Sequence, residues 1–171
     1  MDFAFNKKDR PKIEVKTTKL SLISDIIGTI GVIFLIAYTL YYLGKLPQTI
    51  PVHFNIRGEA DGFGSKYTII LFPIIATFLH TIFFFIKKLP HTYNYPVKIT
   101  QKNAEYQYKL AMNLIHLVRI SVIGLFGFIE WQMIEVSLGN QKDLGMFVIP
   151  AFVILLIGSI IVYFIKAIKN K

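Results

Sequence analysis

The chain has no cysteine among its 171 residues, a single tryptophan, and only 10 acidic residues against 19 lysines and arginines. The lack of cysteine excludes disulfide bonds and thiolate chemistry. A Ser/His/Asp set, an HExxH helix and a glycine-rich phosphate-binding loop are also missing from the sequence, so nothing in it supports catalysis. We therefore expect a non-enzymatic protein with no cofactor and no resident metal.

What the sequence does contain is apolar residues in long runs. Hydrophobic residues make up 54% of the chain, and the mean hydropathy is +0.53. A helix needs about 20 apolar residues to cross a bilayer core, and residues 20–43, 67–86, 110–136 and 146–165 each supply them. Backbone groups in lipid must pair within the protein, and these runs lack the alternation of a barrel. The predicted fold class is an all-α membrane protein, a bundle of four transmembrane helices.

The basic residues flank these runs unevenly. Fourteen of the 19 lie in segments 1–19, 87–109 and 166–171, whereas four lie in segments 44–66 and 137–145. The positive-inside rule then makes the first three segments a cytoplasmic arm, loop and tail, and the other two extracellular loops. Topology and attraction to anionic lipid also explain the net charge of +9, so we expect the lipid bilayer as a partner and no direct nucleic-acid binding.

The connection between the first two runs is unusually long and unusually composed. Residues 46–66 read LPQTIPVHFNIRGEADGFGSK, whereas helices in bundles are usually joined by about 2–8 residues. Its prolines favour extended backbone, its glycines permit tight turns, and residues 52–56 alternate like a short strand. We expect an ordered extracellular lid on the helix ends, with Val52, Phe54 and Ile56 turned inward.

The polar residues of this loop are candidates for a recognition surface. They are His53, Asn55, Gly58, Asp61 and Lys66. A purely structural alternative is that His53 and Asn55 hydrogen-bond the turn backbone, while Asp61 caps a turn or pairs with Lys66 or Arg57. A metal site formed by His53, Glu59 and Asp61 is a weaker alternative, because the spacing matches no known ligand motif.

A second set of polar residues lies inside the apolar runs, where ionisable groups are functional candidates by default. The set comprises Asp25, His80, Arg119 and Glu130. Arg119 and Glu130 are eleven residues apart and so share one helix face. Asp25, His80 and Arg119 are expected at similar depth near the cytoplasmic boundary. An Asp25–Arg119 ion pair that fixes helix register and a proton or ion path through all four residues are the two hypotheses.

Two sequence patterns resemble a known family. The pattern Leu46-Pro47, Ile50-Pro51, His53-Phe54-Asn55, Gly58, Asp61 and Gly64-Ser65-Lys66 resembles the signature of the bacterial membrane family catalogued as domain of unknown function 1648, which includes SdpI-like immunity proteins. Residues 94–108 look like a second box of its stand-alone members. The further box of the immunity proteins, rich in Gly, Arg, Thr, Pro and Trp, is missing here. The resemblance implies a stand-alone relative in the bacterial plasma membrane.

Two functions from different classes follow. In the first, the protein is a receptor or immunity factor whose extracellular loop binds a membrane-active antimicrobial peptide, while residues 87–109 engage a cytoplasmic regulator. In the second, it is a small ion-coupled transporter that uses the intramembrane charges. The second function would require a homo-oligomer, because four helices alone form a narrow pathway. The elaborate loop favours the first function.

Overall fold

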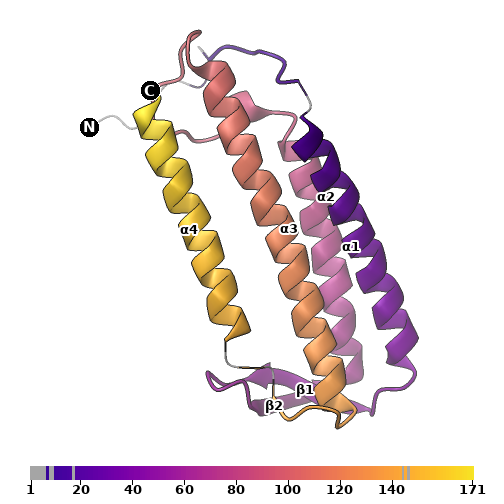
Figure 1. The fold of residues 1–171 in the computed structure, drawn as a ribbon. Coiled ribbons are helices and arrows are strands. Elements are labelled where there is room, and N and C mark those ends of the chain that lie inside the picture. The colour runs from indigo at the N-terminus through magenta and orange to yellow at the C-terminus, as the bar shows by residue number, and fades with distance from the viewer. Residues whose placement is uncertain (1–6, 8–9, 17, 144, 146) are drawn as a thin grey trace.

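The computed structural model of the chain describes residues 7, 10–16, 18–143, 145 and 147–171. Its main elements are long helices and one antiparallel hairpin (Figure 1). The helices are α1 (Lys19–Leu43), α2 (Leu71–Ile86), α3 (Ala104–Ser137) and α4 (Val148–Lys169), and the strands are β1 (Thr49–Phe54) and β2 (Ala60–Ser65). Short 3-10 helices, η2 (Lys66–Ile70) and η3 (Pro90–Thr92), precede α2 and follow it.

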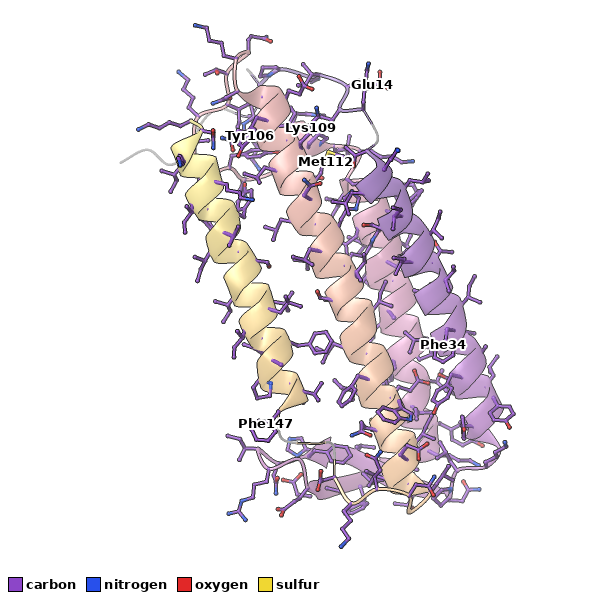
Figure 2. All side chains as sticks on the ribbon, in the orientation of Figure 1. Glu14, Phe34, Tyr106, Lys109, Met112 and Phe147 are labelled. Atoms are coloured by element: carbon purple, nitrogen blue, oxygen red, sulfur yellow. The ribbon has the colours of Figure 1, made fainter. Side chains whose placement is uncertain are left out.

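The structure confirms the predicted fold class and adds a small sheet to it. Four helices are long and apolar enough to cross a membrane, with η2 and α2 together forming the span Lys66–Ile86. Large apolar side chains cover their outer faces: Ile30, Ile33 and Phe34 of α1 are each about 60% exposed, and Phe34 is labelled in Figure 2. An apolar outer face of this kind is stable only against lipid.

The helices lie side by side, and the bundle has two distinct ends (Figure 1). The start of α1 and the end of α4 lie at the same end of the bundle, which we call the terminal end. The hairpin closes the opposite end, which we call the hairpin end. α3 is the central helix, because it packs on α1, α2 and α4.

Two helices extend beyond their predicted bounds. α3 begins at Ala104 rather than residue 110, so the last part of the predicted loop 87–109 is helical. Thr100 and Asn103 start this helix by exchanging side chain to backbone hydrogen bonds of 2.8 and 3.3 Å. α4 continues to Lys169. Hydropathy alone misses such polar helix ends. Residue 146, the predicted start of the fourth span, and residues 1–6, 8–9 and 17 of the predicted arm lie outside the described residues.

The segment before α1 is strapped across the terminal end. Arg10 is only 7% exposed; its guanidinium donates to the carbonyl oxygens of His91 and Tyr93 and lies 5.4 Å from the ring centroid of Tyr95. The Tyr108 hydroxyl donates to the Pro11 carbonyl at 2.9 Å. Burial raises the pKa of the Tyr95 phenol above its usual range, so the ring that faces the guanidinium stays uncharged. The strap ties the chain before α1 to the loop that follows α2.

Candidate functional site

The hairpin between α1 and α2 is an antiparallel pair with an irregular register. Pro51 lies opposite Phe63 and His53 lies opposite Gly62, which leaves Val52 without a partner residue. A bulge of this kind shifts which side chains face the core. The expectation that Val52, Phe54 and Ile56 point inward is wrong for two of them. Val52, at the bulge, is 39% exposed, and Ile56, in the turn after β1, is 95% exposed, whereas Phe54 is half-buried.

The core under the hairpin is formed by other residues. Ile50 is fully buried and Leu46 is 4% exposed. They pack with Ile69, Met133 and Ile134 on the ends of η2 and α3. This apolar contact holds the hairpin against the bundle, so the loop is an ordered lid whose anchor lies three residues before His53.

The tip of the hairpin is organised by Asn55. Its Oδ1 accepts hydrogen bonds from the backbone nitrogens of Arg57 and Glu59 at 2.8 and 3.1 Å, and its Nδ2 donates to Glu59 Oε2 at 2.9 Å. Gly58 has a φ of +82°, a conformation that strains side chains other than glycine. The predicted backbone role of Asn55 is thus present, and Glu59 takes part in the same turn.

His53 and Asp61 face each other across the hairpin. His53 Nδ1 lies 2.5 Å from Asp61 Oδ1, and both side chains are exposed, at 72% and 43%. Lys66 lies at the base of the hairpin instead, where its Nζ donates to the Leu46 carbonyl at 3.4 Å. Asp61 therefore pairs with neither Lys66 nor Arg57 in the described structure. Within the described residues there is no group of three or more His, Asp or Glu side chains that could hold a metal ion.

A cavity of about 420 Å³ opens between the hairpin and the adjoining ends of α3 and α4. Three of the five predicted recognition residues line it, His53, Asn55 and Gly58. Its apolar wall is formed by Val52, Phe54, Ile56, Ile129, Ile149 and Pro150. Sequence reasoning found the polar side of this site but not the wall from α3 and α4, because no sequence signal indicates that those helix ends meet the hairpin.

The intramembrane charges gather at the other end of the bundle. Arg119 Nη2 lies 2.8 Å from Asp25 Oδ1, and Lys87 Nζ forms a second ion pair with Asp25 Oδ2. The side chain of Arg119 is 1% exposed, that of Asp25 is 19% exposed and that of Lys87 is 11% exposed. The predicted Asp25–Arg119 pair is present, but one carboxylate serves two cations. Lys87 was missed because its place just after a helix suggested a solvated loop residue.

His80 lies beside this cluster. Its Nε2 is 3.3 Å from Thr29 Oγ1, and that hydroxyl donates to the Asp25 carbonyl at 2.8 Å. A Cβ at Gly28 would meet two His80 ring atoms at 2.9 Å, so the glycine allows α2 to approach α1 closely. His116, 2% exposed, is a further buried imidazole of α3.

Glu130 lies apart from the other three predicted residues. It is fully buried near the hairpin end and accepts a hydrogen bond from the Thr39 hydroxyl. Eleven residues of α3 separate it from Arg119, which is about 16 Å at 1.5 Å per residue. The structure thus splits the predicted set into a charged cluster of Asp25, His80 and Arg119 and a separate Glu130–Thr39 pair, rather than bringing all four together.

A comparison with known protein families matches the segment of this chain that contains the hairpin. The family model described as Domain of unknown function (DUF1648) matches residues 30–77, which run from the second half of α1 through the hairpin into α2. An uncharacterized protein of Archaeoglobus fulgidus is 25% identical over 142 residues, covering 75% of this chain and 78% of its own. No solved structure matches the chain. All five predicted recognition residues fall in the matched segment, and none of the four intramembrane residues does.

Proposed function

We propose that this chain, a multi-pass membrane protein carrying the domain of unknown function 1648 over residues 30–77, is a non-enzymatic receptor or immunity factor. In this proposal the hairpin end faces outward from the bacterial plasma membrane, and both termini face the cytoplasm, as the lysine and arginine distribution predicts. The ligand is a membrane-active peptide. It binds in the cavity between the hairpin, α3 and α4.

The observation that carries the proposal is the mixed lining of that cavity. Its apolar residues include Ile149 and the 95% exposed Ile56. Its polar residues include His53 and Asn55, each of which contacts a carboxylate beside the cavity, Asp61 or Glu59. Exposed apolar side chains rimmed by polar groups are typical of interaction sites. An amphipathic cationic peptide matches such a surface, since it offers an apolar face to the wall and positive charge to the carboxylates.

The separation of the intramembrane polar groups also favours a receptor over a transporter. An ion path would need a series of neighbouring polar groups along the bundle. Here the Asp25 carboxylate pairs with both Arg119 and Lys87 at the terminal end, and Glu130 is bonded to Thr39 near the other end. These contacts support a structural role in helix register for both sets. The loop between α2 and α3 is then the surface available to a cytoplasmic regulator.

A protection assay tests the proposal. Cells that lack or overexpress the gene are challenged with a panel of membrane-active peptides, and survival is measured for the parent protein and for Ile56→Ser. Ile56 has almost no packing role, so this variant should fold normally and lose protection. Phe63→Ser is the matched control, because Phe63 is 63% exposed on the same hairpin but does not line the cavity. Equal survival of cells with and without the gene against every peptide would refute the receptor hypothesis.

A direct measurement separates binding from cellular effects. The purified full-length protein in detergent is titrated with the peptide that gives the strongest protection. The parent and Phe63→Ser should bind equally, and Ile56→Ser should bind at least tenfold more weakly. A second variant that replaces residues 46–66 by Gly/Ser of equal length should lose both binding and protection. If that variant protects as well as the parent, the hairpin is a passive linker.

A further inference from the structure

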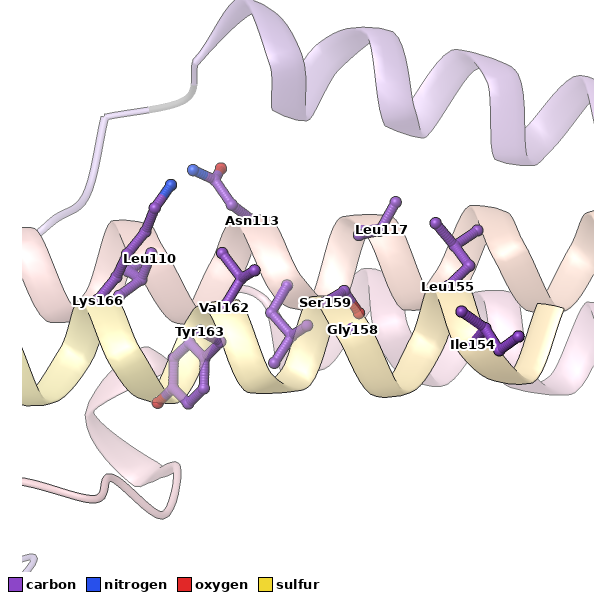
Figure 3. A pocket seen from close by; sticks show the side chains of 11 residues that line it. Leu110, Asn113, Leu117, Ile154, Leu155, Gly158, Ser159, Val162, Tyr163 and Lys166 are labelled. Carbon is purple, nitrogen blue, oxygen red and sulfur yellow. The ribbon is translucent and has the colours of Figure 1, made fainter. Parts of the chain in front are cut away.

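The face between α3 and α4 carries a long groove that the proposed function does not use. Its inner part is a hollow of about 480 Å³ between the two helices (Figure 3). Apolar side chains form most of its walls: Leu110, Leu114, Leu117, Ile154, Leu155 and Val162. At its terminal end the side chains of Asn113 and Lys166 point to the same side (Figure 3). The hydroxyl of Ser159, the other small polar group in the hollow, already donates to the Leu156 carbonyl at 2.7 Å.

A basic hollow continues this groove beyond the terminal end of the helices. It measures about 640 Å³, and Lys98, Lys102 and Lys171 line it. Two further residues also line it: Tyr106 lies one helical turn before Leu110 on the same face of α3, and Asn170 directly follows the end of α4, four residues after Lys166. A hydrogen bond of 3.1 Å from Asn170 Nδ2 to the Tyr106 hydroxyl joins the two helices there. The apolar and basic hollows therefore form one strip.

The charged side chains that line this strip all carry the same sign. Four lysines line it, and the described lining residues include no aspartate or glutamate. The nearest acid in sequence, Glu105, is paired with Lys109 at 2.5 Å and lies more than a third of a turn away from the groove face of α3. Lys166 thus has no acidic partner among the residues that line the groove. An unpartnered cation at the end of an apolar groove favours an anionic group on an apolar tail.

We infer that the groove between α3 and α4 binds one anionic phospholipid. An acyl chain lies along the apolar part, from Leu155 toward Leu110, and the phosphate sits at the terminal end among Lys102, Lys166 and Lys171. Basic pockets between transmembrane helices are suited to anionic headgroups, and lysine side chains reach toward the membrane interface. The bilayer surrounding the protein supplies this ligand at high local concentration.

The same charges argue against a second copy of the chain in the groove. If two copies packed their α4 helices against each other around a two-fold axis parallel to the helices, the lysines at their terminal ends would come together. Like charges that meet at an interface disfavour association. The 22-residue α4 is also exposed along most of its length, with only 6% of its apolar window buried. A lipid covers the groove without adding positive charge.

Native mass spectrometry of the full-length protein tests this inference independently of any peptide. Delipidated protein is titrated with dioleoylphosphatidylglycerol and, separately, with dioleoylphosphatidylcholine, which carries the same tails but no net charge. The parent should retain one phosphatidylglycerol with clear preference. Lys102→Gln/Lys166→Gln should lose roughly 25-fold in affinity for it, because each lysine near an anionic headgroup contributes about fivefold (about 1 kcal/mol). Lys45→Gln/Lys142→Gln, at the hairpin end, is the charge-matched control and should bind like the parent.

A second variant tests the apolar part. A Cβ at Gly158 meets no atom within 4 Å, so Gly158→Leu would fill the groove without displacing a neighbour. It should lower retention of both lipids by tenfold or more, whereas Gly44→Leu, also in open space but at the hairpin end, should not. Equal retention of the two lipids by the parent, or unchanged binding to both groove variants, would overturn the inference. A dimer that excludes lipid would also overturn it and assign the groove to a second copy.

Discussion

The Nδ1 atom of His53, which lines the cavity, lies 2.5 Å from Oδ1 of Asp61 across the two strands of the hairpin. Both side chains are exposed, at 72% and 43%. Ion pairs in such positions contribute about 0–1 kcal/mol to stability. The contact therefore orients the imidazole toward the cavity more than it stabilises the fold.

His53→Ala and Asp61→Ala should accordingly separate recognition from folding. Each should lower the free energy of unfolding by less than about 1 kcal/mol and abolish protection in the survival assay. Asp61→Asn keeps an acceptor for the imidazole and should retain part of the protection. Thermal unfolding in detergent and cell survival are the two measurements. A variant that unfolds easily and is also inactive would show that the pair is structural.

Thiol labelling should give the orientation of the chain. The protein has no cysteine, so a cysteine introduced at the exposed Arg57 is unique and should react with an impermeant reagent in intact cells. Lys98→Cys, exposed at the terminal end, should react only after lysis. The reverse labelling pattern would place the hairpin in the cytoplasm and remove the basis for an extracellular ligand.

Because Asp25 pairs with both Arg119 and Lys87, we expect substitutions of Asp25 and of Arg119 to lower the free energy of unfolding by different amounts. Asp25→Asn strands two cations, Arg119 and Lys87, and should lower the free energy of unfolding by about 3 kcal/mol, as for a broken buried pair. Arg119→Gln leaves Asp25 paired with Lys87 and should cost clearly less. The double variant should recover much of the Asp25→Asn loss, since only Lys87 remains and it can reach the interface. Chemical denaturation in mixed micelles measures all three, and equal, additive losses would refute the shared pairing.

The anchor of the hairpin predicts a contrast between two isoleucines. Ile50 is fully buried and Ile56 is 95% exposed. Ile50→Ala should lower the free energy of unfolding by about 3 kcal/mol, within the range for deleting a buried aliphatic group, whereas Ile56→Ala should change it by less than about 0.5 kcal/mol. The same denaturation experiment checks both. Comparable losses would mean that the hairpin packs in the register first expected from alternation.

The helices could be predicted from sequence because a bilayer imposes a strict condition on length and hydropathy, and the four runs satisfy it. The hairpin register could not be predicted. Alternation of residues 52–56 gives a strand, but the pairing is irregular both between Pro51 and His53 and between His53 and Phe54, so alternation does not fix which side chains face the core. Nothing in the local sequence fixes where such an irregularity falls.

The candidate sites show the same limit. His53, Asn55 and Gly58 were recognisable because turn residues cluster around them, but Ile149 joins their cavity only through the packing of α4 beside the hairpin. Asp25 and Arg119 could be paired by depth alone. Lys87 and Thr39 could not be assigned as partners, because their contacts depend on the rotation of each helix about its axis.

The strap formed by Arg10 has a consequence for how the protein is made. Its carbonyl partners, on His91 and Tyr93, follow it by 81 and 83 residues. At about 5–20 residues per second of translation, His91 and Tyr93 are synthesised roughly 4–16 s after Arg10. The residues of α1 and α2 are synthesised during this interval. The terminal end can close only after this first helical pair is in place. Gln107, which donates to the carbonyl oxygens of Ala167 and Asn170 at 2.9 Å, can make these contacts only after α4 has also been synthesised.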